Sequence, residues 1–440
     1  MRLKPILVTG LLIFLFCLPT VRLNHVGVNA SNGYPVHNLN TGYNYATIQA
    51  AISAPETLNG HVIFVDAGTY YGNVLVDKGI SLIGENKTTT IIDANNTIEA
   101  LTIIANNVSV SGFSVRHSYG TPGMAGGGVM IKGWVSNIQI NDIVVRENSA
   151  DWGVHLTPSS HHITVANTLV LNNSRGGLLL NAVWNVDVYN CTISGNGNAI
   201  QLMNAENNNI HDNLIVGNGY AGISISSANN NYVFNNTLVN NIMGINIANS
   251  ANTTLSNNRL INNTVNFGMS GVSLSHFIHT IDSSNIVDGK PVCYLTNTID
   301  YVVPTDVGWV AAVNSTGIIV RDLDVSHNMH GVMFAFTSDS TIENVTAQSN
   351  LVGISLFSCY NVSLLNDVAS TNGAVYAGPM GGGISLSSCC NNILLNNLAS
   401  NNVGSGIILL NSVNNTLRGN VMTNNTANFM AVPNAPVMTP

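Results

Sequence analysis

Charged residues are scarce in this 440-residue chain. Asp, Glu, Lys and Arg together make up 8% of it, against about 25% in an ordinary soluble domain. Lys and Arg number only 13 and form no cluster. Nucleic-acid binding depends on many cations that neutralise phosphates, so the composition excludes it as a main function. Asparagine, serine and threonine are expected to cover the surface instead.

Long hydrophobic runs are also missing, except at the N-terminus. Arg2 and Lys4 precede an apolar run from Ile6 to Leu18, and Val28-Asn-Ala30 offers small residues for cleavage. This order is typical of an export signal, so we assign residues 1–30 to a signal peptide. The run is short for a bilayer span, and no later stretch is long and apolar enough to cross a membrane. The mature chain is expected to be secreted, at the cell surface or in the periplasm.

Against this plain composition, two residue types recur with a period of about 23 residues, which is short enough to indicate a solenoid. The glycines of this repeat are Gly153, Gly176, Gly222 and Gly244, with Ala199 filling the gap. An asparagine column keeps the same period, at Asn167, Asn190, Asn213, Asn236 and Asn258. A short period held by turn residues predicts a stack of similar coils.

Each repeat opens with a pattern typical of a short strand. The first and third residues after the glycine are mostly aliphatic, as at Ile223 and Ile225, and the residue between them is mostly polar, as at Ser224. Such alternation predicts a strand with one buried face. Further short strands follow before and after the asparagine, and three strands in each repeat predict one rung of a parallel β-helix.

The repeat divides the chain into segments. A short helix over Tyr45–Ile52 has apolar residues at helical spacing and is expected to plug the open end of the stack. The predicted segments are an N-terminal cap with the first coils over 31–100, regular coils over 101–270, a period-breaking insertion over 271–315, further coils over 316–425 and a C-terminal tail over 426–440.

The asparagine column is expected at the corners between strands. Asparagine tolerates left-handed backbone angles, and stacked amides can hydrogen-bond from rung to rung. Several asparagines, such as Asn235 before Asn-Thr, also match the glycosylation pattern. Chance matches are frequent in a chain this rich in Asn, Ser and Thr. We therefore interpret the column as structural.

The cysteines show neither a disulfide framework nor metal-finger spacing. Cys359 and Cys389 each lie six residues after a repeat glycine, so they are expected to stack on adjacent coils. Strands in register are about 4.8 Å apart, which is within the reach of a disulfide. A reduced pair fits the same spacing, and the sequence leaves both states open.

Two other stretches accompany the coil repeat. One runs from Thr47–Ile52 through Val65–Tyr70 to Ser81–Glu85, and the other from Ile281–Asn285 through Val287–Val292. With these features the chain resembles the NosD-like, right-handed parallel β-helix proteins, which share the pectin-lyase fold. The resemblance implies an all-β, right-handed parallel β-helix with a short N-terminal helical cap, a periplasmic or cell-surface location, and binding of carbohydrate or copper.

One dense polar patch is the candidate for catalysis. Cleavage of a glycosidic bond needs two carboxylates about 5 to 9.5 Å apart, and acids are sparse. Arg146, Glu147, Asp151 and His155 could converge at one corner, with His161 and His162 nearby. The alternative is a surface cluster, because His155 occupies the outward column and the pectinase and epimerase acid motifs are missing. A second patch of this kind consists of Arg321, Asp322, Asp324 and His327.

A copper site would need thioether or thiolate and imidazole ligands. The candidates are His327, Met329, His330 and Met333, with Met333 expected to point outward by its position after Gly331. The alternative is that these methionines only fill irregular gaps in the packing.

Carbohydrate binding would favour exposed aromatic residues on a long face. Aromatics make up only 6% of the chain, and the outward position between the aliphatic residues has none. Those near turns either line a groove or cap the rungs, and they are Trp134, Trp152, Trp184, Tyr220 and Tyr376. We interpret the chain as an exported, non-catalytic protein that binds polysaccharide or cell-envelope glycan. The alternatives are a copper-binding accessory protein and a carbohydrate-active lyase, hydrolase or epimerase.

Overall fold

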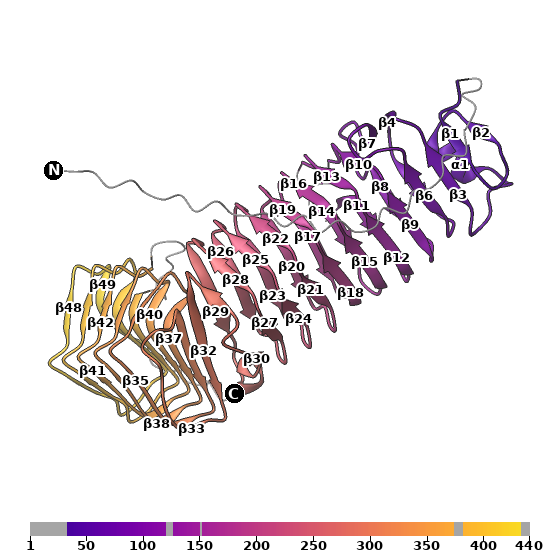
Figure 1. The fold of residues 1–440 in the computed structure, drawn as a ribbon. Coiled ribbons are helices and arrows are strands. Elements are labelled where there is room, and N and C mark those ends of the chain that lie inside the picture. Colours follow the sequence, from indigo (N-terminus) through magenta and orange to yellow (C-terminus); the bar gives the residue numbers. More distant parts are fainter. Residues whose placement is uncertain (1–32, 120–125, 150–151, 374–381, 433–440) are drawn as a thin grey trace, which may run out of the picture.

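The computed structural model describes residues 33–119, 126–149, 152–373 and 382–432. Within these ranges the chain is nearly all strand and winds into a right-handed parallel β-helix (Figure 1). The predicted fold class is therefore confirmed. The assigned signal peptide, Asp151 and Tyr376 lie outside the described residues.

The N-terminal end of the β-helix is closed by a cap. Helix α1 (Ile48–Ser53) begins after Thr47, whose hydroxyl accepts a hydrogen bond from the Ala50 N–H at 3.1 Å, as expected of a threonine N-cap. Ile48, Ala51 and Ile52 are buried against the first coils. The predicted plug helix is present, and it is shorter than the predicted range.

The described residues between 33 and 287 form a first stack with three sheets, which we call A, B and C. Each coil contributes one strand to each sheet, and nearly all neighbours pair in parallel. Sheet A contains β1 (Val36–Asn38), β2 (Asn44–Tyr45), β3 (Val62–Val65), β6 (Ser81–Gly84), β9 (Val108–Ser111), β12 (Ser136–Asn141), β15 (His161–Ala166), β18 (Trp184–Tyr189), β21 (Asn209–His211), β24 (Tyr232–Phe234), β27 (Thr254–Ser256) and β30 (Thr280–Ile281).

Sheets B and C complete these coils. Sheet B contains β4 (Gly68–Tyr71), β7 (Thr90–Asp93), β10 (Ser114–Arg116), β13 (Val144–Arg146), β16 (Leu169–Leu171), β19 (Thr192–Ser194), β22 (Leu214–Val216), β25 (Thr237–Val239), β28 (Arg259–Ile261) and β31 (Ile286–Val287). Sheet C contains β5 (Val74–Val76), β8 (Leu101–Ile103), β11 (Gly127–Ile131), β14 (Trp152–Leu156), β17 (Gly176–Asn181), β20 (Asn198–Met203), β23 (Ala221–Ser226), β26 (Met243–Ala248) and β29 (Val265–Ser270).

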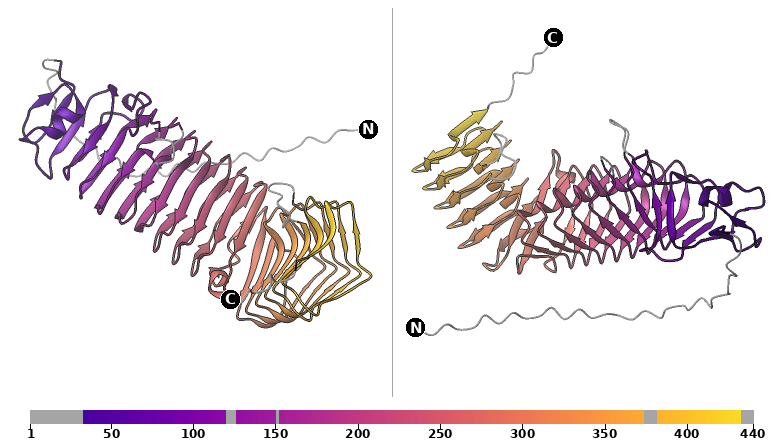
Figure 2. Two further views of the ribbon diagram at one scale, coloured as in Figure 1. Left: turned by 180° about the vertical axis from the view of Figure 1, so that it is seen from behind. Right: turned by 90° about the horizontal axis from the view of Figure 1, so that it is seen from above.

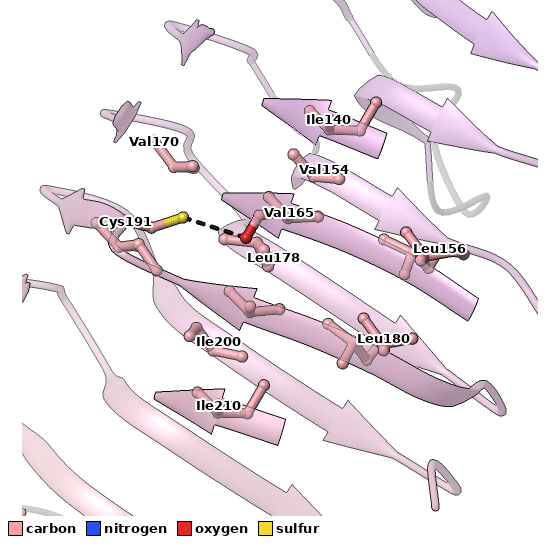
Figure 3. Packing of buried hydrophobic residues seen from close by; sticks show 14 of the residues in the cluster. Ile140, Val154, Leu156, Val165, Val170, Leu178, Leu180, Cys191, Ile200 and Ile210 are labelled. Atoms are coloured by element: carbon pink, nitrogen blue, oxygen red, sulfur yellow. Dashed lines mark hydrogen bonds between the residues drawn. The ribbon is translucent and has the colours of Figure 1, made fainter. Parts of the chain in front are cut away.

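The interior of the first stack is built from aliphatic files. Val154, Leu178 and Ile200 pair in register on successive strands of sheet C, and all three are fully buried (Figure 3). Burying one such side chain contributes about 1.5–3 kcal/mol. The repeated aliphatic positions of the sequence therefore form one continuous core.

The register corrects the predicted glycine column at one coil. Val154 pairs with Leu178, so Gly177 rather than Gly176 follows Gly153 in the column. A Cβ on Gly177 would lie 2.5 Å from the Ala199 carbonyl oxygen, which requires glycine there. The coil that ends at Leu178 is slightly longer than the period and the next coil is slightly shorter, so an apparently even spacing concealed the shift.

The predicted asparagine column likewise merges two neighbouring columns. Asn167 and Asn190 have the left-handed backbone with φ of 52° and 51°, whereas Asn213 and Asn236 occupy the next position and are buried. The Asn213 Nδ2 donates to Asn236 Oδ1 at 3.0 Å and to the Val188 carbonyl at 2.9 Å. The corner and the amide ladder are both present, at adjacent positions of the coil.

A second amide ladder runs beside this one and is longer. Its members are buried and bond from each rung to the next, at Asn148, Asn173, Asn196, Asn218, Asn241 and Asn263. Each amide satisfies backbone groups that the corner would otherwise leave unpaired in the interior. Asparagine is therefore a structural residue of these corners and not only a residue of the surface.

The described residues between 290 and 432 form a second stack with sheets D, E and F. Sheet D contains β32 (Lys290–Thr296), β34 (Trp309–Val313), β37 (His330–Ala335), β40 (Val352–Phe357), β43 (Gly382–Ser387), β46 (Ser405–Leu410) and β49 (Ala427–Val432). Sheet E contains β33 (Ile299–Val302), β35 (Thr316–Arg321), β38 (Ser338–Glu343), β41 (Tyr360–Leu365), β44 (Ile393–Leu395) and β47 (Thr416–Arg418). Sheet F contains β36 (Asp324–Ser326), β39 (Thr346–Gln348), β42 (Val368–Ser370), β45 (Leu398–Ser400) and β48 (Val421–Thr423).

The two stacks meet at a tight reversal inside the period-breaking segment. Strands β31 and β32 pair antiparallel around Asp288 and Gly289, whose φ angles of 47° and 89° are both positive. Two such residues, especially Asp-Gly, are typical of a type I′ hairpin turn. After the reversal the second stack leaves the first at an angle, so the molecule is bent (Figure 2).

The outer face of sheet D closes the open end of the first stack. Trp309 is fully buried, and its ring lies 4.4 Å from that of Phe267, between ring centroids. Met333 belongs to the same apolar cluster and is only 2% exposed. It does point away from its own stack, as predicted, but the neighbouring stack covers it. The second stack has its own separate interior cluster.

Cys359 and Cys389 are reduced and buried in one corner column. The Cys359 Sγ lies 3.4 Å from the carbonyl oxygens of both Phe334 and Phe357, and its single S–H can donate to either of them. The Thr337 hydroxyl group, one rung earlier in the same column, lies against two backbone carbonyl oxygens in the same way. The thiol therefore replaces a hydroxyl or an amide of the ladder, and burial raises the pKa of Cys359 well above its ordinary value.

Asp367 occupies an amide-ladder position in the second stack and is fully buried. Its Oδ1 accepts a hydrogen bond from the Val345 N–H at 2.9 Å, but its Oδ2 lacks a partner among the described residues. The next member of the column is Asn397. Burial raises the pKa of Asp367 from 3.8 to about 8, so the folded chain holds a neutral carboxyl group at neutral pH.

The pKa of Asp367 predicts a pH-dependent stability. Because the folded pKa lies above the unfolded one, the stability linked to this group is complete below about pH 4. It decreases as the pH rises from about 4 to about 8, and is constant above that. Asp367→Asn, which restores the amide, should raise the free energy of unfolding at pH 9 by about 2–4 kcal/mol. Urea titrations of both proteins at pH 5 and pH 9 measure this, and an equal difference at both pH values would contradict it.

Candidate functional site

The outer face of sheet A carries a group of rings over three successive strands. We call Trp184, Tyr189, His211, Tyr232 and Phe234 the aromatic patch. They lie on β18, β21 and β24, whose inward residues fill the core. Side chains alternate between the two faces of a strand, so Tyr189, His211, Tyr232 and Phe234 project away from the core while the aliphatic residues hold the strands. Trp184 precedes Asn185, whose positive φ of 54° turns the chain, so Trp184 lies at the rim of the patch.

Three rings of the aromatic patch form one stack along the axis of the β-helix. Tyr189, His211 and Phe234 pair in register. The ring centroids are 5.2 Å apart from Tyr189 to His211 and 4.5 Å from His211 to Phe234, with interplanar angles of 10° and 4°. The stack therefore presents ring edges to the solvent. Ser256, the next residue in register, is too small to cover the far face of Phe234.

Trp184 and Tyr232 extend the patch across the sheet. The Trp184 ring stacks on that of His161 at 4.8 Å with an interplanar angle of 11°. Tyr232 is 49% exposed and lies two positions before Phe234 on the same face. His161 and His162, expected near the polar patch around Arg146, therefore lie beside the aromatic patch on sheet A.

Two carboxylates lie among the rings. His211 Nε2 is 2.9 Å from Asp187 Oδ1, and His211 Nδ1 is 2.7 Å from Asp212 Oδ2. Both aspartates are partly exposed. The imidazole is thus fixed between two rings and two acids. The arrangement places carboxylate oxygens, which accept hydrogen bonds, beside aromatic surface on one face.

The sequence-predicted polar patch is only partly assembled. Arg146 and Glu147 lie at the end of β13 with a contact of 3.4 Å between Arg146 Nη1 and Glu147 Oε1. His155 lies beyond the next turn, on sheet C. The prediction that His155 is exposed to solvent is wrong, because the residue is only 4% exposed. The outward column of sheet C is therefore not a solvated surface at this coil.

Arg146 and Glu147 instead join a charged cluster that the sequence analysis missed. Arg116 Nε donates to Asp93 Oδ2 at 2.9 Å, and His117 Nδ1 lies 3.0 Å from the same oxygen. His117 Nε2 lies 3.6 Å from Glu147 Oε2. Asp93, Arg116 and Arg146 occupy one in-register column of sheet B. In the sequence these three charged residues recur about once in every coil. The coils differ in length here, so the recurrence is hard to recognise.

Asp93 is the buried member of this charged cluster. Burial acts to raise its pKa, but hydrogen bonds from the Asn95 N–H and the Arg116 guanidinium, together with His117, hold the pKa of Asp93 below its ordinary value. A carboxylate paired this fully is a stable anion rather than a general acid. The cluster therefore fits a structural ion pair at the sheet edge better than a pair of catalytic acids.

The second polar patch is an exposed turn. Arg321, Asp322 and Asp324 are exposed, and Asp322 Oδ1 accepts a hydrogen bond from Asn344 Nδ2 at 3.2 Å. No ion pair joins Arg321 to either aspartate in the part of the chain that the structure describes. Asp322 has a left-handed backbone, with φ of 51°, so it serves the corner of the coil.

The four predicted copper ligands lie in different surroundings. His327 is exposed and bonds Ser326. Met329 packs against the cluster of Ala221, Met243 and Val265, and Met333 lies in the core at the junction of the stacks. Burial lowers the pKa of His330 to about 4. Two thioethers in separate apolar clusters do not fit one copper ion.

Metal ligation by other side chains finds no support either. Among the described residues, no group of three His, Cys, Asp or Glu side chains lies close enough together to hold a metal ion. A copper site in this arrangement would have to use fewer ligands or a rearranged junction.

The predicted aromatic candidates divide by environment. Trp134 is 79% exposed, Trp152 is buried at 3%, and Tyr220 is 40% exposed at a turn. Only Trp184 belongs to the aromatic patch. Tyr189, His211 and Phe234 lie on sheet A, whereas the outward column recognised in the sequence lies on sheet C. Their recurrence at the period of the coils is the signal that would have found them.

Fold and site define a right-handed parallel β-helix protein with an aromatic outer face. The chain belongs to the family described as "Periplasmic copper-binding protein (NosD)", whose model matches residues 26–243, 136–291 and 293–434. Across the described segments, no helix has the length and apolar character that a membrane crossing requires.

Individual relatives match with lower coverage or identity. A cell surface glycoprotein of Methanothermus fervidus is 40% identical over 81 residues, which are 18% of this chain and 13% of that protein. The match thus spans about an eighth of the relative's length.

Solved structures resemble the chain at low identity. The A-module of Azotobacter vinelandii mannuronan C-5 epimerase AlgE6 is 14% identical with a TM-score of 0.33, over 88% of this chain and 91% of the module. The pre-mature bacteriophage phi29 gene product 12 is 13% identical with a TM-score of 0.43, over 85% and 69%. A likeness at this level says nothing about activity or substrate.

Proposed function

We propose that this protein is an exported, non-catalytic binding protein for a cell-surface or periplasmic glycan, which it holds on the outer face of sheet A. The observation that carries the proposal is the aromatic patch with Asp187 and Asp212 among its rings. The uncovered face of Phe234 and the exposed ring of Tyr232 offer apolar contact to the C–H faces of sugars, and the carboxylates accept hydrogen bonds from their hydroxyl groups.

The geometry of the stack favours a glycan that runs along the axis of the β-helix. One rung advances by about 4.8 Å, which is close to the length of one pyranose unit in an extended chain. The aromatic patch covers the rungs of β18, β21 and β24, so it fits a segment of three to four sugar residues. The outer face of a sheet contacts a sugar from one side only, so affinity should grow with chain length.

The proposed location has independent support. Residues 1–30 have the pattern of an export signal, the family is described as periplasmic, and the relative of 40% identity is called a cell surface glycoprotein. Copper binding is the alternative that the family description favours, and the divided ligand set argues against the residues predicted for it.

Removal of Tyr232 tests the proposed function. Tyr232→Ala should weaken binding of a glycan hexamer about tenfold, because an aromatic contact of this kind is worth about 0.5–1.5 kcal/mol beyond the area it buries. Tyr360 on β41 of the second stack is 48% exposed, so Tyr360→Ala is a matched control that should leave binding unchanged. Calorimetric titration of the full chain measures both, and equal affinities for both variants would contradict the proposal.

A further inference from the structure

We propose that the aromatic patch selects uncharged, hydroxyl-rich glycans and rejects polyuronates, an inference that rests on the proposed function. The patch has acids but no permanent cation. Asp187 and Asp212 lie among its rings, and Glu206, the bridge partner of Trp184, is exposed beside it. The only basic group in the patch is His211, which both aspartates already contact.

Lysine and arginine are missing from the whole strip of sheet around the patch. Strands β9, β12, β15, β18, β21, β24 and β27 contain neither of them. Lys87, which pairs with Asp142 at the end of β12, and Arg259, which begins β28 across the corner from Ser256, lie outside the rungs of the patch. Along β18, β21 and β24 a glycan would therefore meet no lysine or arginine of the sheet. A polyuronate brings one carboxylate with every sugar, and over the patch these would approach Asp187, Asp212 and Glu206 with His211 as the single basic group of the patch.

The aspartates retain capacity for a neutral partner. Asp187 contacts His211 through Oδ1 and Asp212 contacts it through Oδ2, so each carboxylate keeps its second oxygen. An ionised carboxylate only accepts hydrogen bonds. Sugar hydroxyl groups can donate to these oxygens, whereas the carboxylates of a uronate cannot. The same two acids thus attract one class of glycan and repel the other.

Sheet B shows what a face suited to anions would contain. Arg116 and Arg146 stand on neighbouring rungs there, but each is within 3.4 Å of a carboxylate oxygen, of Asp93 and Glu147 respectively. These two arginines are therefore not arranged to offset the acids of the aromatic patch. The proposed selectivity for uncharged glycans therefore depends on where the charged side chains lie: the arginines are on sheet B and the acids of the patch are on sheet A.

The experiment compares a neutral β-glucan hexamer with a hexamer of mannuronate on the full chain. The neutral hexamer should bind at least about tenfold more tightly at low ionic strength, and the gap should narrow in about 0.5 M salt, which screens exposed charges. The double variant Asp187→Asn, Asp212→Asn should strengthen mannuronate binding about tenfold. Asparagine already stands at the neighbouring positions of both columns, at Asn209 and Asn235, so the fold should tolerate the change.

Asp322→Asn is the control, because Asp322 is an exposed aspartate with left-handed backbone on the second stack. It should change neither affinity. If both hexamers bind equally and both depend on Tyr232, the charge selection is wrong and the proposed function stands. If mannuronate binds more tightly than glucan and the double variant does not alter it, the inference is overturned. If no binding depends on Tyr232, the proposed function itself fails.

Discussion

Replacing Asn241 by alanine should lower the free energy of unfolding of the first stack by about 2–4 kcal/mol. Asn241 is buried in the long amide ladder. Its Nδ2 donates to Asn263 Oδ1 at 3.0 Å and to the Ile215 carbonyl at 3.2 Å. Alanine removes these bonds and leaves the partners without water or a substitute.

The ladder makes the loss larger than that of one hydrogen bond. Asn241 Oδ1 also accepts from the backbone N–H and from the Nδ2 of Asn218, at 3.0 and 2.9 Å. Removing it therefore strands donors on the preceding rung, and each buried unpaired group costs about 1–3 kcal/mol. Coils of a solenoid depend on their neighbours, so the damage should spread to the adjacent rungs.

Asn240 provides a control from the same turn. It is exposed and has a left-handed backbone with φ of 55°, which glycine adopts without strain. Asn240→Gly should therefore change the unfolding free energy by less than about 1 kcal/mol. Urea unfolding followed by circular dichroism measures both variants, and hydrogen exchange shows which rungs open. Similar losses of unfolding free energy for the two variants would show that the buried ladder stabilises the fold no more than an exposed corner asparagine does.

Trp309→Ala should cost about 3–5 kcal/mol and loosen the junction of the two stacks. Trp309 is fully buried on the outer face of sheet D, against Phe267 of the first stack at 4.4 Å and parallel to Tyr294 at 6.3 Å, between ring centroids. Alanine would leave a cavity between two rigid bodies that have little freedom to close it.

The loosened junction should be visible in the shape of the molecule as well as in its stability. The bend depends on packing at the junction and on the short hairpin at Asp288 and Gly289, so small-angle scattering should detect a broader range of shapes. Unfolding should separate into two transitions, because each stack has its own interior cluster. Trp134→Ala, at a site 79% exposed, is the control. A single unchanged transition for Trp309→Ala would contradict this account of the junction.

Much of the fold could be predicted from the sequence because each coil repeats the same local rules. Alternation at Ile223, Ser224 and Ile225 identifies a strand, and the structure confirms the strand and its two inward isoleucines. The prediction of only one buried face is wrong here, because the outward Ser224 is also buried. The register between strands is harder to predict from the sequence, because a long coil followed by a short one has the same total length as two regular coils. The error at Gly176 arose in this way, and only strand pairing corrected it.

The candidate site was less predictable because it depends on which columns meet on one outer face. Tyr189, His211 and Phe234 are each separated by a whole coil in the sequence, yet they stack in space. Conversely, Arg146 and His155 are close in the sequence but lie on different sheets. Proximity along the chain misleads in a β-helix, because the turn between two strands separates their outer faces.

The repeat in the sequence is enough to predict the architecture: a stack of short coils with aliphatic files inside and asparagine at the corners. These features follow from local alternation and turn chemistry that every coil satisfies with its own residues. Three features are visible only in the folded molecule: the coils form two stacks, Met333 is buried at their junction, and the rings gather on sheet A. Such features depend on contacts between residues of different coils, and no single coil contains the information that sets them.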